Sequence, residues 1–238
     1  MPHTIAHTTS TGIDACALKI AAIVCMTIQH AAYVFGAAWP LPALCICYFF
    51  GGFTFLIMAF LLTEGYRYTR DVKKYALRLL VFALVSEIPY WLVLEHNGNV
   101  LFTLLIGLVI LYANDHVENR AAFAGILVAG VALSALCDWG IIGPIAIYVF
   151  KICREDERRG AIAIAPLIVA IAGAAGAAET ILESGTAAGL PALFYAVGNL
   201  ASAVPLAVYN GQRGRGLKYF FYLYYPLHIA MIGLIACV

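Results

Sequence analysis

The sequence predicts an all-α, polytopic integral membrane protein with about nine transmembrane helices. Hydrophobic residues make up 63% of the 238 residues and charged residues only 11%, whereas about a quarter of the residues in a soluble domain are charged. A membrane-spanning helix needs about 20 mostly apolar residues, and most of the chain divides into such blocks, separated by polar turns. The Lys and Arg residues also gather in alternate turns. These three observations exclude a soluble globular fold.

The chain is expected to begin with a polar tail over residues 1–16, followed by a single transmembrane helical domain over residues 17–238. The tail is rich in Thr and His and contains no Lys or Arg, so it lacks the positive n-region of a signal peptide. We therefore expect a retained first helix over residues 17–36. Pro40 and Pro42 mark the turn that follows it.

A cationic bend joins a second expected helix, over residues 43–64, to a third over residues 75–94. This hairpin fixes the orientation of the chain, because positively charged loops stay on the cytoplasmic side of a membrane. Lys and Arg also favour phosphate groups, so the bend is a candidate binding site for a phosphorylated cytoplasmic ligand. Its candidate ligand-binding cations are Arg67, Arg70, Lys73 and Lys74.

Six further helices complete the expected fold. Their expected ranges are 100–113, 121–137, the segment from the turn at Gly140 to 150, 160–178, 187–209 and 219–238. With nine helices and the cationic bend inside, all 14 Lys and Arg residues lie on the cytoplasmic side. This partition predicts a cytoplasmic N-terminus and an external C-terminus.

The cysteines give no sign of a metal or redox site. There are seven of them, nearly all within or at the ends of apolar segments. Cys45 and Cys47 are separated by one residue, which suits neither a zinc knuckle nor a thioredoxin-like pair. We interpret the cysteines as small packing residues and expect no metal. The lipid bilayer is the expected partner, and no nucleic acid is expected.

Ionisable side chains inside the predicted spans are the first candidates for function, because each charge there costs about 2.5 kcal/mol or more. His30 lies about two-thirds along the first helix, next to the neutral amide of Gln29. It is a candidate general base, proton relay or ligand, or alternatively a histidine that only hydrogen-bonds between helices. Glu64 lies three residues before Arg67, and this spacing fits either a capping ion pair or the mouth of a cytoplasmic pocket.

Two more candidates lie deeper in the predicted spans. Glu87 lies roughly 12 Å into the third helix, counted from Leu79 at 1.5 Å per residue. It is either a catalytic carboxylate or a structural residue beside Pro89. His228 lies near the middle of the last helix, one turn after Tyr225 and beneath an aromatic run that is itself typical of a membrane interface. Two histidines and a carboxylate from three helices suggest a reaction chamber.

Several motifs resemble the TraX family in both order and spacing. They are AFLLTEGYRYTR at 59–70, RLL at 78–80, SEIP at 86–89, NVLFTL at 99–104, DWG at 138–140 and YPLH at 225–228. The resemblance covers nearly the whole chain from Ala17 onward. The family is named for the F-pilin acetylase, an inner-membrane enzyme that acetylates the N-terminal amine of pilin. The resemblance therefore implies a multi-pass protein of the inner (cytoplasmic) membrane with acetyl-CoA as its acyl donor.

By this resemblance we expect an acetyl-CoA-dependent N- or O-acetyltransferase. Its acceptor would be an amine, such as the N-terminus of a pilin-like or other small membrane peptide, or a hydroxyl. The expected catalytic residues are His228, His30 and Glu87, and the expected CoA-binding residues are Arg67, Arg70, Lys73 and Lys74. The expected substrate or pocket residues are Glu64, Gln29, Tyr225, Asn99, Thr103 and Asp138.

This sequence departs from the family pattern in the first two helices. Gln29 stands where the family has an aspartate before the histidine, and Gly52 and Leu56 replace an arginine and a proline. Without an acidic neighbour the imidazolium of His30 loses its counter-charge, which favours His228 as the general base. The alternative function is a permease or a small-molecule-binding membrane protein that uses the same polar groups without catalysis.

Overall fold

The computed structural model describes residues 12–155 and 159–237, so most of the predicted tail lies outside it. Within these two ranges the chain is all-helical, with two isolated backbone bridges and no strand. Its first part contains α1 (Ala15–Phe35), the short 3₁₀ helix η1 (Gly36–Ala38), α2 (Leu41–Gly51), α3 (Phe53–Tyr68), α4 (Val72–Val93) and α5 (Val100–His116). Its second part contains α6 (Arg120–Ser134), α7 (Ile142–Glu155), η2 (Arg159–Ala163), α8 (Ile164–Ser184), α9 (Thr186–Ala201), α10 (Ala203–Ala207) and α11 (Lys218–Ala236).

Six stretches of the described chain are long and apolar enough to cross a membrane. They are Ala15–Ala38, Leu41–Tyr68, Val72–Val93, Ala161–Ser184, Thr186–Ala207 and Tyr219–Ala236. The helices α5 and α6 are apolar but shorter, with 17 and 15 residues. The protein is therefore a multi-pass helical membrane protein. Each of the nine predicted ranges overlaps a helix, while nine membrane crossings stay a prediction.

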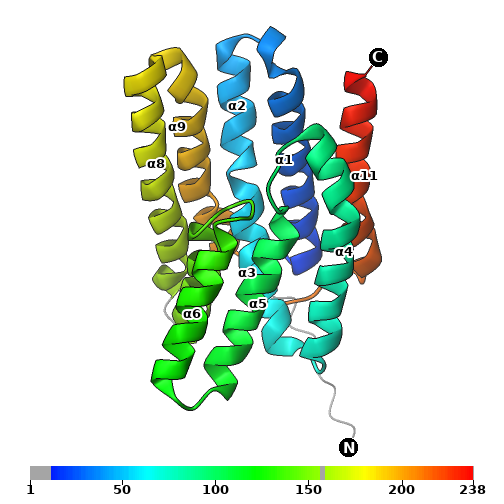
Figure 1. Ribbon diagram of the computed structural model, residues 1–238, viewed down its shortest axis with the longest axis vertical. Helices are drawn as coiled ribbons and strands as arrows, with labels where there is room; N and C mark the ends of the chain where they lie inside the picture. Colours follow the sequence, from blue (N-terminus) through cyan, green and yellow to red (C-terminus); the bar gives the residue numbers. More distant parts are fainter. Residues whose placement is uncertain (1–11, 156–158, 238) are drawn as a thin grey trace, which may run out of the picture.

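The helices form an elongated bundle in which most helices that follow one another along the chain run in opposite directions, while α2 and α3 continue in the same direction (Figure 1). The pair α8 and α9 lies at one side, and α1, α4 and α11 lie at the other. The helices α5 and α6 occupy the lower part of the bundle, and the loop after α4 descends from its top to reach α5. The start of α1 and the end of α11 lie at opposite ends of the bundle. Their orientation relative to the two sides of a membrane stays a prediction.

The cationic hairpin is tighter than the sequence indicated. The helix α3 continues to Tyr68 and α4 begins at Val72, so the turn holds only residues 69–71. The early start of α4 has a local cause, because the Asp71 carboxylate accepts a hydrogen bond from the backbone N–H of Lys74 at 2.9 Å and caps the helix. This bond also holds the pKa of the exposed Asp71 carboxyl below its ordinary value.

Two glycines allow α2 to lie close to α9. The predicted second helix is divided at Gly52, which ends α2 and begins α3. A Cβ atom at Gly52 would overlap the backbone of α9, and one at Gly198 would overlap the carbonyl oxygen of Phe49. Glycine at both positions therefore permits backbone contact between the helices, as is common where membrane helices pack closely.

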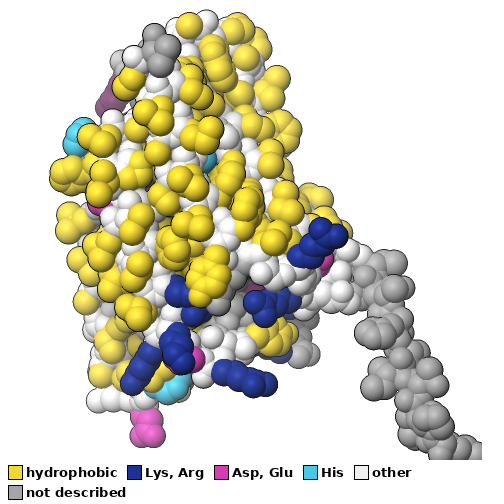
Figure 2. Space-filling model, turned by 90° about the vertical axis from the view of Figure 1, so that its right-hand side faces the viewer, with side chains coloured by type: hydrophobic (Ala, Val, Ile, Leu, Met, Phe, Trp, Pro, Cys, Tyr) yellow, Lys and Arg dark blue, Asp and Glu magenta, His cyan; other side chains and the backbone are white. Residues whose placement is uncertain are grey.

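The outer surface separates apolar from cationic side chains. Figure 2 shows a broad band of hydrophobic side chains over the face that includes α4 and α11, and Lys and Arg side chains around a hollow toward its lower end. Leu84 and Leu92 of α4 are 56% and 80% exposed, and Leu234 of α11 is 70% exposed. Exposed leucines in such number fit contact with lipid.

Candidate functional site

The two candidate histidines meet, although 198 positions separate them in the chain. His30 of α1 and His228 of α11 lie with Nδ1 and Nε2, respectively, 2.9 Å apart. The two rings are nearly parallel, with their centroids 5.1 Å apart. The other ring nitrogen of His228, Nδ1, lies 3.0 Å from the backbone carbonyl oxygen of Tyr224. A single chain of hydrogen bonds therefore runs from the backbone of α11 to the side chain of His30.

The direction of these hydrogen bonds follows from the carbonyl group. A carbonyl oxygen can only accept, so Nδ1 of His228 carries a proton and donates it to Tyr224. In the neutral ring Nε2 then holds a lone pair and accepts a hydrogen bond from Nδ1 of His30. The Nε2 atom of His30 is consequently unprotonated, and no residue of the described chain hydrogen-bonds to it. The open proton acceptor of the histidine pair thus lies on His30.

Neighbouring side chains hold the pair in place. The Tyr224 ring stacks on His228 with their centroids 5.2 Å apart. Thr27, one turn before His30 on α1, donates to the carbonyl oxygen of Ile23 and so accepts from the Tyr224 hydroxyl at 2.7 Å. This second bond between α1 and α11 limits sliding of one helix along the other. Gln29 lies outside the pair, because its side chain packs against Gly51 of α2.

An internal cavity of about 580 Å³ leads toward the histidine pair from the cationic end. Its wall on α1 includes Lys19, Ile23 and Met26. Residues three or four apart share one face of a helix, so His30 continues this row one turn beyond Met26. The row from Lys19 to His30 is roughly 16 Å long at 1.5 Å per residue. On α11 the cavity wall includes Tyr225, whose ring lies 5.7 Å from that of His228.

The cations that line this cavity differ from most of those expected from the sequence. Of the four predicted CoA-binding cations only Arg70 lines it, and Arg67, Lys73 and Lys74 are exposed elsewhere on the hairpin. The other cations of its wall come from α1, α4 and the loop before α11. They are Lys19, Arg78, Arg213 and Arg215. Because these cations come from three separate segments, the sequence showed no pattern that joins them beyond the positive charge of each segment.

Glu64 lies at the cavity wall, as the pocket interpretation expected, but its partner is not Arg67. The buried Glu64 carboxylate accepts two hydrogen bonds from Arg154 of α7, from Nε at 2.8 Å and from a terminal nitrogen at 3.3 Å. This two-point contact neutralises the carboxylate in the wall. The cavity therefore keeps a positive charge.

Glu87 is held by Asn99 and not by a histidine. One carboxylate oxygen accepts from the side-chain amide of Asn99 at 2.5 Å and from its backbone N–H at 3.1 Å. The same amide donates to the carbonyl oxygen of Ala83 at 2.8 Å, and its oxygen caps α5 by accepting from Leu101. Asn99 is fully buried. These contacts fix the junction of α4 and α5 and leave the second oxygen of Glu87 without a hydrogen bond in the described chain.

Thr103 and Asp138 belong to the same junction. The Thr103 hydroxyl donates to the backbone carbonyl of Asp138, and the backbone N–H of Asp138 donates to Gly98 at 2.6 Å. Trp139 adopts a positive φ of 70°, and its ring stacks on Phe55 with centroids 4.0 Å apart. Burial raises the pKa of the Asp138 carboxyl to about 6. The turn between α6 and α7 thus brings a second carboxylate to the level of Glu87.

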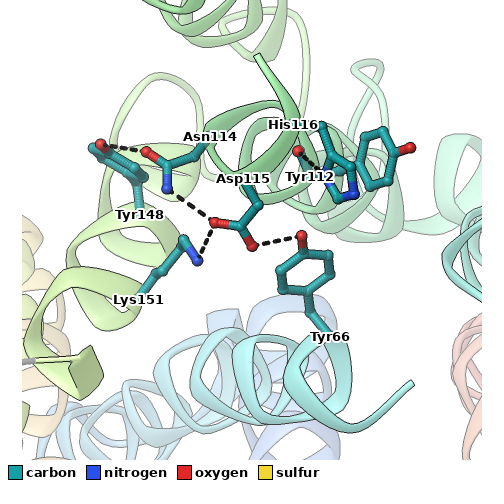
Figure 3. A network of polar contacts seen from close by, with 7 residues as sticks. All are labelled: Tyr66, Tyr112, Asn114, Asp115, His116, Tyr148 and Lys151. Carbon is teal, nitrogen blue, oxygen red and sulfur yellow. Dashed lines mark hydrogen bonds and ion pairs between the residues drawn. The ribbon is translucent and has the colours of Figure 1, made fainter. Parts of the chain in front are cut away.

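Sequence reasoning missed a polar network at the cationic end of the bundle (Figure 3). One oxygen of Asp115 in α5 lies 2.7 Å from Nζ of Lys151 in α7, and the other accepts from the hydroxyl of Tyr66 in α3 at 2.7 Å. Asn114 donates to Asp115 at 3.2 Å and accepts from Tyr148 at 3.1 Å. The network ties three helices together.

In residues 12–155 and 159–237, no group of three or more His, Cys, Asp and Glu side chains is arranged to hold a metal.

Comparison with known proteins agrees with the motifs. The profile of the family described as "TraX protein" matches residues 15–236. A relative from Dichelobacter nodosus, named "Probable fimbrial assembly protein FimC, serogroup H1", is 31% identical over 236 aligned positions, which cover 90% of this chain and 92% of the relative. No solved structure matches the chain.

Proposed function

Because this chain belongs to the TraX family, we propose that it is a membrane acyltransferase that moves an acetyl group from acetyl-CoA to an amine or hydroxyl acceptor. The proposed acceptor is the N-terminus of a pilin-like or other small membrane peptide. The relative named as a fimbrial assembly protein supports an acceptor of this kind. Acetyl-CoA is made in the cytoplasm, so we assign the protein to the inner, or cytoplasmic, membrane.

The histidine pair is the observation that carries this proposal. A nucleophilic amine or hydroxyl must lose a proton as it attacks the thioester carbonyl, and a positioned base accelerates this step about 10²–10⁴-fold. Nε2 of His30 is an unprotonated nitrogen with no partner in the described chain, beyond the deep end of a cavity that begins at the cationic end. In the proposed reaction the new C–N or C–O bond forms, the C–S bond breaks, and the proton passes through His30 to the departing thiolate.

His228 has a positioning role in this mechanism. Its Nε2 accepts from Nδ1 of His30 at 2.9 Å and so fixes the His30 ring. In the proposed reaction the opposite nitrogen, Nε2 of His30, takes the proton of the acceptor. When His30 takes up a proton, the same hydrogen bond lets the positive charge be shared between the two rings. This sharing substitutes for the counter-charge that Gln29 cannot supply. The proposed base is therefore His30, and the preference for His228 drawn from the sequence is revised.

Tyr225 is the proposed hydrogen-bond donor to the thioester carbonyl. Its buried hydroxyl forms no well-aligned hydrogen bond within the described chain, although the backbone N–H of Val100 lies nearby, and the residue is 5% exposed at the cavity wall. A buried hydroxyl without a partner is costly, and a carbonyl oxygen of a bound ligand would satisfy it. As the carbonyl becomes an oxyanion during attack, such a donor stabilises the transition state.

The carboxylates of Glu87 and Asp138 are proposed to bind the acceptor. Glu87 has one oxygen free of hydrogen bonds in the described chain, and Asp138 lies at the same junction of α4, α5 and α7. An acceptor that arrives as an ammonium ion would be held there before it gives up its proton. Asn99 and Thr103 support this region by fixing the backbone around it.

An assay for release of free thiol tests the proposal. The full-length protein in proteoliposomes is given acetyl-CoA and a peptide with a free N-terminus. The expected products are free CoA, detected by a thiol reagent, and a peptide heavier by one acetyl group. The matched control is His96→Gln, which replaces an exposed histidine on the loop before α5. A permease would release no CoA, and transport of the intact molecule without thiol release would contradict the proposal.

A further inference from the structure

The internal cavity carries an excess of positive charge that the protein does not neutralise. The charged residues in its wall are the five cations Lys19, Arg70, Arg78, Arg213 and Arg215 and the single acid Glu64, which is already paired with Arg154. In the described chain none of these five cations lies within ion-pair distance of a carboxylate. Cations gathered around a cavity without counter-charges favour an anionic ligand.

The cations near the helices are held in place by aromatic rings. Nζ of Lys19 lies 5.6 Å from the centre of the Phe221 ring, and the guanidinium of Arg78 lies 5.6 Å from that of Tyr75. Nε of Arg78 is buried and has no hydrogen-bond partner among residues 12–155 and 159–237. A guanidinium N–H without a partner in a cavity wall is available to an oxygen of a ligand.

The loop before α11 is fixed so that it contributes two more cations. The backbone N–H of Asn210 donates to the carbonyl oxygen of Ile13 at 3.0 Å, and that of Ala15 donates to Gln212 at 2.9 Å. Gly214 has a positive φ of 65°, and a Cβ there would overlap the carboxylate of Asp14. The beginning of α1 therefore holds this loop, with its two arginines, against the mouth of the cavity.

We propose that this cavity binds the phosphate groups of a nucleotide-containing thioester, with Arg70, Arg213 and Arg215 at the mouth and Lys19 and Arg78 further in. The apolar wall beyond them, which includes Met26 and Leu104, takes the uncharged arm of the ligand. The row from Lys19 to His30 then sets roughly 16 Å between the innermost phosphate contact and the base. This inference rests on the proposed function and names the part of the protein that selects the donor.

Direct binding of unacylated CoA is the test. The full-length protein in nanodiscs of zwitterionic lipid is titrated with CoA, dephospho-CoA and inorganic pyrophosphate by calorimetry. We expect CoA to bind more tightly than dephospho-CoA, and both affinities to fall as salt is raised. In Arg213→Gln/Arg215→Gln the affinity for CoA should fall about tenfold or more, because each loss removes a charge-assisted contact.

The hairpin supplies a matched control with the same loss of charge. Arg67→Gln/Lys73→Gln also removes two exposed cations, but neither residue lines the cavity, so its CoA affinity should stay within about twofold of the wild type. Arg78→Gln, which removes the guanidinium whose Nε has no partner in the described chain, should weaken binding as the loop variant does.

Three outcomes would overturn the inference. They are no CoA binding by the wild type, an equal loss of affinity in both double variants, and displacement of CoA by vesicles of anionic lipid, which would identify a lipid headgroup as the occupant. CoA binding without thiol release would instead contradict acyl transfer and leave this site standing. Thiol release with unchanged binding in the loop variant would reject the site alone.

Discussion

Two polar regions link helices of this protein, and they differ in how completely their hydrogen bonds are satisfied. In the network around Asp115 both carboxylate oxygens have partners, and the residues come from α3, α5 and α7 (Figure 3). In the histidine pair the chain of hydrogen bonds ends at Nε2 of His30, which has no partner in the described chain. A saturated network stabilises a fold, whereas an acceptor without a partner, one helical turn beyond the cavity wall at Met26, is available for chemistry. The comparison therefore separates a structural cluster from the proposed catalytic one.

The largest expected effect belongs to the open end of the histidine pair. His30→Gln should lower the turnover number by about 10²–10⁴-fold, because it removes the proposed base, while the melting temperature changes little. His228→Gln should lower it only about 10–10²-fold, since Gln can still accept from Nδ1 of His30.

The pH dependence of turnover in the same two variants distinguishes the proposed base, His30, from the proposed positioning residue, His228. Wild-type activity should rise with pH as the pair loses its proton. His228→Gln should shift the midpoint of this rise, and His30→Gln should abolish it. A His30→Gln protein with near-normal turnover would end the assignment of the base.

The next largest effect is expected at Tyr225, whose hydroxyl at the cavity wall is the proposed donor to the oxyanion. Tyr225→Phe removes only the hydroxyl, which forms no well-aligned hydrogen bond in the described part of the chain. Turnover should fall about 10–10²-fold with little change in KM, because a donor to the oxyanion acts mainly in the transition state. Stability should stay equal or rise slightly, since a buried unpartnered group is lost. A KM that rises in proportion to the loss of activity would indicate substrate binding instead.

Substitutions in the Asp115 network should lower stability and leave turnover unchanged, the opposite of what is expected at the histidine pair. Nζ of Lys151 lies 2.7 Å from Asp115, and their side chains are 9% and 35% exposed. Asp115→Asn should lower the free energy of unfolding by about 2 kcal/mol, less than for a fully buried pair because Asp115 is partly in contact with solvent. Turnover per folded molecule should be unchanged. Unfolding in detergent and thiol release measure the two quantities.

The double variant Asp115→Asn/Lys151→Met is the control for this pair. It should be more stable than the sum of the two single variants indicates, because each single change removes this ion-pair contact from the charge that remains. If Asp115→Asn lowers turnover per folded molecule while the free energy of unfolding stays unchanged, the division between the structural and the proposed catalytic cluster is wrong.

The smallest expected effect concerns Asp138, whose carboxyl lies in the turn after α6. Its pKa is raised from 3.8 to about 6 by burial, so the folded state prefers the protonated form. This contribution to stability is present below pH 3.8 and is lost as the pH rises through about 6. The melting temperature of the wild type should therefore decrease more across this interval than that of Asp138→Asn. Parallel decreases in the two proteins would contradict the burial of this carboxyl.

Many features of the fold follow from the sequence alone. Long apolar blocks require membrane helices, since the bilayer leaves a backbone no other way to satisfy its hydrogen bonds without closing a barrel. The turns at Pro40, Asp71 and Asn99 are equally local, because each depends on a few neighbouring residues that end or cap a helix. Family membership was also predicted from short motifs and is confirmed by the profile match over residues 15–236.

The tertiary structure alone decided which polar groups meet. His30 and His228 were both candidates, but nothing local indicates that residues 198 positions apart share a hydrogen bond. The bond to the Tyr224 carbonyl then makes His30 the open acceptor, which reverses the order that Gln29 suggested. Likewise Arg78, Arg213 and Arg215 join Lys19 around one cavity only because α1, α4 and the loop before α11 pack together. Periodicity along one helix fixes which face a side chain occupies, whereas the packing of helices decides what that face contacts.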